Sequence, residues 1–230
     1  MKPALAIFVK TAGLSPVKTR LAATLGTAHA THFHELAAAA TAAVARQCRP
    51  ALTPYWAVAE SAPEASEAWP EFENLWQGTG GLGERLHHVY SELQARHGSV
   101  LLIGADAPQL TPSLLTDALH ALAAPGNPFA MGNAADGGFW LFGGRMPIAR
   151  EVWQNVRYSQ ADTGAQLRHA LAASGGTSQL PTLADVDHAS DLDLLAAALD
   201  ALSDPLPAQR SLRDWLRVIL SKAPQQVVDA

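Results

Sequence analysis

The sequence is poor in cysteine, aromatic residues and long apolar runs. Its single cysteine, Cys48, excludes an intramolecular disulfide and any multi-cysteine metal site. Cys48 lies in an alanine-rich stretch with a helical pattern, where a buried thiol without a catalytic role is the more common outcome. Near the amino terminus only the short apolar run Ala4 to Val9 precedes Lys10, which is too short for the core of a signal peptide. No apolar stretch approaches the length of a membrane span, so we expect a cytoplasmic protein without a membrane partner.

Positive charge is scarce as well. The chain has 16 lysines and arginines against 21 aspartates and glutamates, a formal net charge of -5. A nucleic-acid-binding surface needs a basic face, so this balance predicts no nucleic-acid partner. The histidines show no metal-ligand spacing, and no serine lies in a Gly-x-Ser-x-Gly context, which disfavours a zinc site and a hydrolase triad. The chemistry of this chain is therefore expected at a local cluster of residues.

Apolar runs of strand length alternate with helical patterns along the 230 residues, 48% of which are hydrophobic. This alternation is typical of a mostly parallel sheet flanked by helices, and the length suits one sizeable core. We predict strands at Leu5–Val9, Tyr55–Ala59, Val100–Gly104, Phe129–Gly132 and Phe139–Phe142, and helices at Ala28–Cys48, Leu82–His97, Pro112–Ala123, Asp162–Ala173 and Ser190–Leu202. The stretch Glu60–Glu73 has no clean period and is predicted to be a solvated excursion. The predicted fold class is α/β, with a single Rossmann-like domain.

The composition changes near residue 203. Residues 1–202 are predicted to form the α/β domain, and residues 203–230 a proline-containing linker and a C-terminal amphipathic helix. Leu212, Trp215, Leu216 and Ile219 fall on one face of that helix. The face would either close over the domain or contact a partner, such as a second copy in a homo-oligomer.

The first predicted strand ends in a loop that carries three positive charges. Lys10, Lys18 and Arg20 stand in a segment that contains glycine, serine and proline, and a helical pattern follows. Cations neutralise phosphate oxygens, and the backbone N–H groups at a helix start donate to them. The segment therefore predicts a site for a nucleotide or another phosphate. The alternative is a surface loop that happens to be basic.

Two aspartates are candidate metal ligands. Asp106 follows the continuously apolar strand predicted at Val100–Gly104. Ligands of open parallel sheets bind outside the carboxyl ends of the strands, so Asp106 should reach the same edge as Lys18. A carboxylate among phosphate-binding cations suits Mg²⁺ or Mn²⁺ that bridges the phosphates, although Asp106 could instead cap the following turn. Asp187, in the run Asp185-Val186-Asp187, is the candidate for a second metal ligand.

Two glycine-containing loops complete the set of candidates. Asp136 is followed by two glycines and an aromatic run, so it could contact a sugar or an acceptor and is our candidate catalytic residue. An Asp-Gly pair between apolar runs is also a strong hairpin signal, and both interpretations can hold together. Gly83 belongs to a group of glycines before a predicted helix, which suits contact with a nucleotide or a flexible turn equally well.

Taken in order, five short motifs resemble a bacterial family of predicted glycosyltransferases of the GT-A type, formerly a domain of unknown function, with some members assigned to arsenosugar biosynthesis. The motifs are Lys18-Thr19-Arg20-Leu21 after Lys10, Gly80-Gly81-Leu82-Gly83-Glu84-Arg85, Ile103-Gly104-Ala105-Asp106-Ala107-Pro108, Asp136-Gly137-Gly138-Phe139 and Asp185-Val186-Asp187. The resemblance implies a nucleotide-diphospho-sugar transferase fold, shared with nucleotidyltransferases such as those of molybdopterin guanylylation. By position it implies a phosphate-binding Lys18 and Arg20, a metal site at Asp106 that Asp187 completes, and a functional loop at Asp136.

Residues and resemblance together predict a metal-dependent glycosyltransferase with a nucleotide-sugar donor, a small-molecule acceptor and Mg²⁺ or Mn²⁺ as cofactor. Two alternatives stay open. One is a nucleotidyltransferase that acts on a nucleoside triphosphate, although the Gly-Gly-x-Ser-x-Arg-Met-Gly loop of many such enzymes is missing. The other is a non-catalytic nucleotide-binding subunit that docks through the helix around Trp215. The chain departs from the family at Gly81, where an aspartate is usual, which argues against a metal or sugar role for that loop.

Overall fold

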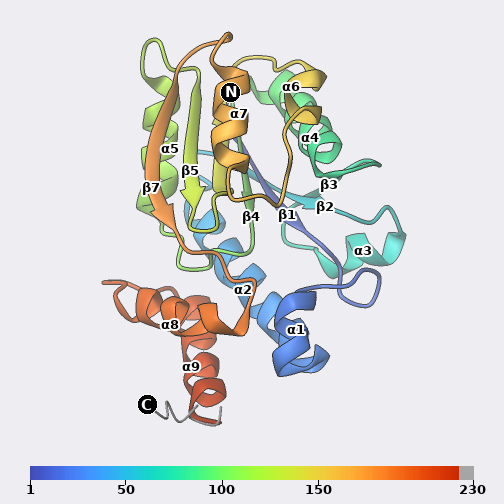
Figure 1. Cartoon of the computed structure of the whole chain (residues 1–230), viewed down its shortest axis with the longest axis vertical. Helices are drawn as coiled ribbons and strands as arrows, with labels where there is room; N and C mark the ends of the chain where they lie inside the picture. Colours follow the sequence, from blue (N-terminus) through green and yellow to red (C-terminus); the bar gives the residue numbers. More distant parts are fainter. Residues whose placement is uncertain (223–230) are drawn as a thin grey trace.

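The computed structural model describes residues 1–222 and shows a sheet between layers of helices (Figure 1). The strands are β1 (Ala4–Val9), β2 (Thr53–Val58), β3 (Glu73–Trp76), β4 (Val100–Gly104), β5 (Phe129–Ala134), β6 (Phe139–Gly144) and β7 (Thr177–Leu183). The helices are α1 (Thr19–Leu25), α2 (Thr27–Gln47), α3 (Pro63–Ala68), α4 (Leu82–His97), α5 (Pro112–Ala123), α6 (Arg150–Gln154), α7 (Thr163–Leu171), the short η1 (Ala189–Asp191), α8 (Leu192–Asp200) and α9 (Pro207–Lys222). None of these helices is both long and apolar enough to cross a bilayer.

The strands form one seven-stranded sheet in the order β3-β2-β1-β4-β6-β5-β7. Within residues 1–222, β6 is the one strand that runs antiparallel to its neighbours, β4 and β5. The other neighbouring pairs are parallel. Because the chain direction reverses at β6 and again at β5, the carboxyl ends of all the other strands reach the same edge of the sheet. The predicted α/β fold with a mostly parallel sheet is confirmed.

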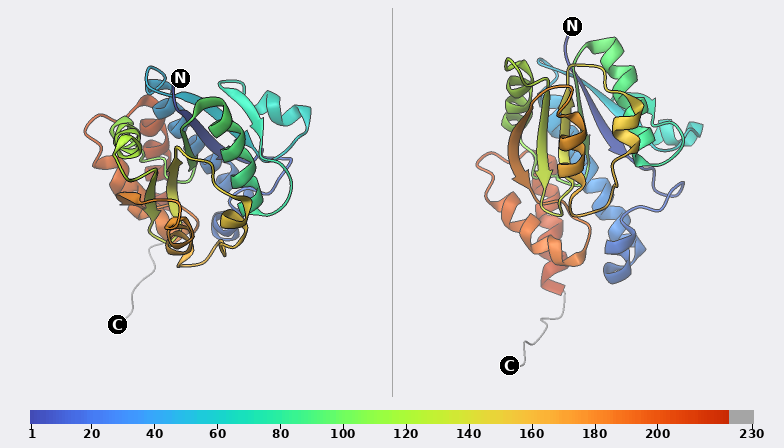
Figure 2. Two further views of the ribbon diagram at one scale, coloured as in Figure 1. Left: turned by 90° about the horizontal axis from the view of Figure 1, so that it is seen from above. Right: turned by 45° about the horizontal axis from the view of Figure 1, so that its top comes forward.

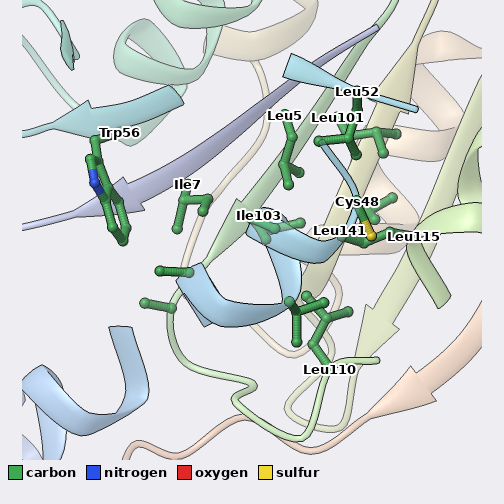
Figure 3. Close-up of a cluster of buried hydrophobic side chains, with 14 of the residues drawn as sticks. Leu5, Ile7, Cys48, Leu52, Trp56, Leu101, Ile103, Leu110, Leu115 and Leu141 are labelled. Carbon is green, nitrogen blue, oxygen red and sulfur yellow. The ribbon is translucent and has the colours of Figure 1, made fainter. Parts of the chain in front are cut away.

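Helices cover both faces of the sheet, as Figure 2 shows from two directions. On one face, Leu5 and Ile7 of β1 pack against helices α2 and α5 (Figure 3). On the other face, Ala4 and Ala6 belong to a cluster with α4, α6 and α7. Burial on both faces explains why β1 and β4 are apolar without alternation. Cys48 is buried in the first cluster, and burial raises the pKa of its thiol, which agrees with a packing role.

The ends of two helices follow directly from local chemistry. Thr111 Oγ1 accepts a hydrogen bond from the backbone N–H of Leu114, and Pro112 occupies the first position of α5. Gly98 ends α4 in the left-handed conformation, with φ at 76°. These signals explain why the predicted bounds of α4 and α5 agree with the structure.

The structure also contains elements that the sequence did not predict, among them α3, β3, α6 and β7. The stretch Glu60–Glu73 is not a solvated excursion, because α3 lies within it and Ala65 and Phe72 are buried. Trp69 Nε1 donates to Thr11 Oγ1 at 3.0 Å and attaches the segment to the domain. β7 has the sequence Thr-Ser-Gln-Leu-Pro-Thr-Leu and lies at the edge of the sheet. An edge strand tolerates polar residues and proline, which hides its pattern.

Helix α9 packs one face against other helices of the protein. Leu212 and Leu216 are buried in a third cluster formed with α1, α2 and α8, and Trp215 and Ile219 pack against that cluster. The predicted apolar face of this helix is confirmed. The protein's own helices cover it, which is the first of the two expected alternatives, and a homo-oligomer stays a prediction. The division of the chain at residue 202 stays a prediction, and residues 223–230 of the predicted segment lie outside the described residues.

Candidate active site

Charged residues of both signs gather at the edge where the parallel strands end. Asp106 follows β4, Asp136 follows β5, and both Asp185 and Asp187 follow β7. Lys10 follows β1. Because these strands run parallel, the backbone brings the residues after them to one place. Carboxylates that are far apart in the sequence therefore share a site with the predicted phosphate-binding loop.

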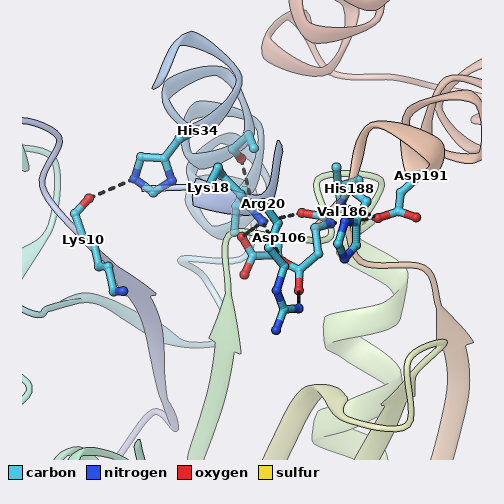
Figure 4. Close-up of polar contacts among 11 residues, drawn as sticks. Lys10, Lys18, Arg20, His34, Asp106, Val186, His188 and Asp191 are labelled. Carbon is cyan, nitrogen blue, oxygen red and sulfur yellow. Dashed lines mark hydrogen bonds and ion pairs between the residues drawn. The ribbon is translucent and has the colours of Figure 1, made fainter. Parts of the chain in front are cut away.

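Lys18 lies at the centre of this site. Its backbone is left-handed, with φ at 45° and ψ at 46°, and its side chain is only 6% exposed. The Nζ atom lies 2.6 Å from Asp106 Oδ1 and 3.7 Å from Asp187 Oδ1, and it donates to the carbonyl of Val186 (Figure 4). A left-handed backbone is uncommon in a residue other than glycine, and these contacts hold it in place. The two aspartates that were predicted to bind a metal thus face one cation already.

Arg20, in the first turn of α1, contacts the Asp187 carboxylate as well. Its Nη1 lies 2.8 Å from Asp187 Oδ2, and its side chain is 56% exposed. The backbone N–H of Val186 donates to the Asp106 carbonyl at 3.1 Å, which ties the segment after β7 to the end of β4. Ion pairs this exposed add little to the free energy of unfolding. Their effect is to fix the carboxylates relative to the Lys18 loop.

Two adjoining cavities open at this edge. The larger has a volume of about 610 Å³, and its lining includes all the cations predicted from the sequence and a histidine: Lys10, Lys18, Arg20 and His34. The smaller has a volume of about 250 Å³, and its lining includes aromatic side chains, Phe139 and Trp140. The residues that line both cavities are Phe8, Asp106, Asp136, Ser159 and Gln160. The two cavities therefore share a wall that contains two carboxylates.

Asp136 lies in the tight turn between β5 and β6, so the predicted hairpin is confirmed. Asp136 Oδ1 accepts a hydrogen bond of 2.8 Å from the backbone N–H of Gly138, which orients the carboxylate. Gly137 has φ at 90°, and a Cβ atom there would overlap the carbonyl of Ala161, so no other residue fits. The turn holds Asp136 firmly at the shared wall, a position that suits the predicted catalytic role.

Asp185 lines the smaller cavity, and the sequence interpretation gave it no role. Its burial, and after that the negative charges of Asp136, Asp187 and Asp106, raise its pKa to about 6. The acidic run at Asp185 was visible in the sequence. Because β7 was not predicted, nothing in the sequence placed this carboxylate at the edge of the sheet.

Replacing Asp185 by asparagine is expected to raise the melting temperature near pH 7.5 and to leave it almost unchanged near pH 4. The pKa in the folded protein, about 6, lies above the ordinary value of 3.8, so folding favours the protonated carboxyl. The protonated carboxyl contributes its full stabilisation below pH 3.8, and this stabilisation is lost as the pH rises through about 6. Thermal unfolding in EDTA, with the exposed Asp117→Asn as control, measures the difference. Equal melting temperatures near pH 7.5 would contradict the raised pKa.

The structure places Lys10 in the site but not Gly83. Lys10 lines the larger cavity, and its carbonyl accepts a hydrogen bond from His34 Nε2 at 2.8 Å when that nitrogen carries the proton. Gly83 lines neither cavity. A Cβ atom at Gly83 would lie 2.5 Å from the carbonyl oxygen of Trp153 and 2.8 Å from the ring of Tyr158. Close packing of α4 against α6 explains this glycine, and its contact with a nucleotide stays a prediction.

Ser159 and Gln160 line both cavities, and nothing in the sequence marked them. Ser159 has φ at 59°, a backbone conformation that costs about 1–3 kcal/mol in residues other than glycine. Thr163 Oγ1 supports it, since it accepts from the N–H of Gln160 at 3.1 Å and lies 2.9 Å from the carbonyl of Arg157. The segment before α7 is therefore held in a strained form against both cavities, as is common at functional sites.

The carboxylates fit a metal ion that binds together with phosphate. Within residues 1–222, no group of three or more His, Cys, Asp or Glu side chains is arranged to hold a metal. Asp106 and Asp187 do converge on one cation position, which the Lys18 ammonium takes. Mg²⁺ commonly uses one or two carboxylates, with substrate phosphates and waters as its other ligands. The donor set therefore suits a cation that arrives with a nucleotide better than an ion enclosed by protein alone.

Comparison with known proteins agrees with this geometry. The family DUF2064, described as an uncharacterized protein conserved in bacteria, matches residues 35–160. The crystal structure of a "putative nucleotide-diphospho-sugar transferase" from Desulfovibrio desulfuricans G20 matches with a TM-score of 0.81 and 25% sequence identity. The match covers 96% of this chain and 98% of that chain. No curated protein matches the sequence.

More distant structures share the fold. A 4-diphosphocytidyl-2C-methyl-D-erythritol synthase from Anaerococcus prevotii DSM 20548 matches with a TM-score of 0.56 and 10% identity, over 86% of this chain and 96% of that one. A manganese complex of Rv0371C from Mycobacterium tuberculosis H37Rv matches with a TM-score of 0.50 and 16% identity, over 87% and 100%. The predicted transferase fold is confirmed. Since the family model matches more than half of its length, the chain belongs to the bacterial family DUF2064.

Proposed function

We propose that this protein is a metal-dependent glycosyltransferase that moves a sugar from a nucleotide-sugar donor to a small-molecule acceptor. The observation that best supports this function is a pair of adjoining cavities with Asp136 on their shared wall. Cations and carboxylates line one cavity, and carboxylates and aromatic side chains line the other. The diphosphate of a donor needs the cations, and a sugar or an acceptor packs well against aromatic faces. The reacting carbon of the donor would then lie at the shared wall.

In the larger cavity, Lys18, Arg20 and the exposed Lys10 would contact the two phosphates. Charge-assisted hydrogen bonds to phosphate are short and strong, and a guanidinium can bind two oxygens at once. Asp106 and Asp187 would hold Mg²⁺ or Mn²⁺, which when bound supplies positive charge to the leaving nucleoside diphosphate. To contact a phosphate, the Lys18 ammonium has to loosen its ion pair with Asp106, which would free that carboxylate for the metal.

Asp136 is the proposed catalytic residue. The acceptor hydroxyl would attack the anomeric carbon of the sugar, so that a new carbon–oxygen bond replaces the bond between that carbon and the diphosphate. The nucleoside diphosphate would leave with the electron pair of the broken bond, and Asp136 would take the hydroxyl proton. The hydrogen bond from Gly138 holds this carboxylate in one orientation, which favours proton transfer in a fixed geometry.

Nucleotidyl transfer is the second candidate function. The fold is shared with the Anaerococcus prevotii synthase, whose name includes a diphosphocytidyl group. In such a reaction the α-phosphate of a nucleoside triphosphate would be attacked and pyrophosphate released. The same cations and carboxylates would serve this reaction. A third candidate, a nucleotide-binding subunit without catalysis, would bind the nucleotide and form no product.

Incubation of the purified protein with nucleotide-sugars and Mn²⁺ is expected to release nucleoside diphosphate and free sugar slowly, because water takes the place of the acceptor. No pyrophosphate is expected from nucleoside triphosphates. Mass spectrometry of reactions with UDP-, GDP-, ADP- and CDP-linked sugars and with the four ribonucleoside triphosphates identifies the products. Asp136→Asn should slow the release by roughly 100-fold or more, the contribution expected of a general base.

The matched control is Asp117→Asn, on the exposed side of α5, which should release products at the unmodified rate. Pyrophosphate release that depends on Asp106 would replace glycosyl transfer by nucleotidyl transfer. A rise in melting temperature with nucleotides, but no product from any donor, would favour the binding subunit instead.

A further inference from the structure

The smaller cavity differs from the larger one in charge. Among the described residues that line it there is no lysine, arginine or histidine. Its charged side chains are all carboxylates: Asp106, Asp136 and Asp185. The cations of the site, such as Lys18 and Arg20, line the larger cavity. The larger cavity is also lined by Asp106, Asp136 and Asp187, so its cations and carboxylates balance, whereas the smaller cavity has carboxylates alone.

Most of the remaining wall of the smaller cavity is apolar. Its large apolar side chains are Phe8, Leu82, Leu86, Leu102, Ile103, Phe139 and Trp140. Trp140 Nε1 donates to the carbonyl of Pro181 at 2.9 Å, so the polar atom of the indole is satisfied and the ring forms an apolar surface. Leu82 is 47% exposed, which places an apolar side chain where the cavity meets solvent. The volume of about 250 Å³ is about eight times the share of one water in the liquid, enough for a small ring.

We infer that the smaller cavity is the acceptor subsite, and that the acceptor is a small alcohol with an apolar body that is either uncharged or carries an amine. Phosphorylated and carboxylated acceptors would be excluded. The inference rests on the proposed glycosyl transfer and adds the chemical class of its acceptor. Placing an anion beside several carboxylates costs affinity, whereas a hydroxyl or ammonium group donates hydrogen bonds to them. The hydroxyl would face Asp136, the proposed proton acceptor.

Three benzyl compounds of similar shape test the class of acceptor: benzylamine, benzyl alcohol and benzyl phosphate. Each is titrated into the full chain without donor, and the indole N–H signal of Trp140 is followed by NMR after assignment with Trp140→Phe. Trp140 lines the smaller cavity but not the larger one. Its indole signal therefore reports on ligands in the smaller cavity and not on phosphate that binds to the cations of the larger one. We expect benzylamine and benzyl alcohol to bind at least about tenfold more tightly than benzyl phosphate. Equal or tighter binding of benzyl phosphate, or no binding of the other two at millimolar concentration, would overturn the inference.

An exposed position allows a positive charge to be added to the cavity. Leu82→Arg should tighten benzyl phosphate binding by about tenfold and weaken benzylamine binding. Leu194→Arg is the matched control, because Leu194 is 63% exposed on α8 and lines neither cavity. Asp185→Asn is a second variant and should reduce the ratio by which benzylamine binds more tightly than benzyl phosphate. If both Leu82→Arg and Asp185→Asn fold and keep the preference of the unmodified protein, the carboxylates do not select the ligand.

These titrations contain no donor, so their outcome is separate from that of the product assay. Pyrophosphate in the product assay would contradict the proposed glycosyl transfer but would not change the measured charge preference of the smaller cavity. Tighter binding of benzyl phosphate would contradict the inferred class of acceptor but would not contradict the proposed glycosyl transfer.

Discussion

Replacing Asp106 by asparagine is expected to weaken the Mn²⁺-dependent binding of a nucleoside diphosphate by about tenfold or more, with little change in melting temperature. Asparagine keeps the shape of the side chain but lacks the charge that a divalent cation requires. The variant also loses the 2.6 Å ion pair with Lys18. The Asp106 carboxylate is 51% exposed, and the buried Lys18 ammonium keeps its contacts with Asp187 and the Val186 carbonyl, so we expect little change in the free energy of unfolding. Calorimetry with UDP, GDP, ADP and CDP, each with and without Mn²⁺, measures the effect.

The comparison without metal makes this test specific. In Asp106→Asn the Lys18 ammonium loses a competitor for phosphate, so metal-free binding of the nucleoside diphosphate should stay the same or improve. Asp117→Asn is the control for loss of one negative charge elsewhere. Equal Mn²⁺-dependent affinity in Asp106→Asn and the unmodified protein would show that Asp106 holds no metal.

Replacing Lys18 by methionine should weaken nucleoside diphosphate binding by roughly 10- to 100-fold, the range expected for a lost charge-assisted hydrogen bond. Binding of the corresponding nucleoside should hardly change, because the ammonium is expected to contact phosphate only. Mn²⁺ alone should bind more tightly to the variant, since Lys18 Nζ no longer occupies the position between Asp106 and Asp187. Calorimetric titration of the diphosphate, the nucleoside and Mn²⁺ measures the three effects separately.

Lys2→Met is the control, because Lys2 Nζ donates to the Arg49 carbonyl on another part of the protein and should affect none of the three titrations. Methionine is similar in length to lysine but lacks the ammonium, whose Nζ lies 5.9 Å from the centre of the Phe33 ring. Equal losses for nucleoside and nucleoside diphosphate would assign Lys18 to the fold or to base recognition.

The elements that the sequence predicted well are those with strong local signals. β4 has the predicted bounds because its run of apolar residues ends abruptly at Gly104. α5 has the predicted bounds because Thr111 and Pro112 fix its start. β3 and β7 were missed for the opposite reason: both are short or polar strands at the sheet edges, where pairing with a neighbour and not local preference decides the structure.

The candidate site was predictable in its location but not in its contacts. The rule that ligands bind at the carboxyl ends of parallel strands brought Lys18 and Asp106 to one edge. It gave no distance, and the structure shows that the two side chains form an ion pair. Asp185 could not be placed without β7, and the left-handed backbone of Ser159 depends on tertiary contacts. The glycine spacing around Gly83 could not separate a ligand contact from close packing, since both require the absence of a side chain.

The contacts of Lys18 also have a consequence for synthesis and folding. The hydrogen bond from Lys18 to Val186 joins residues 168 positions apart, and that from Arg20 to Asp187 joins residues 167 apart. Such a long loop has to close before either contact can form, and closure is slow and entropically unfavourable until the sheet is in place. A nascent chain that ends before Val186 therefore has cations but no complete site. These contacts, which complete the site around Lys18, can form only when almost the whole domain has been made.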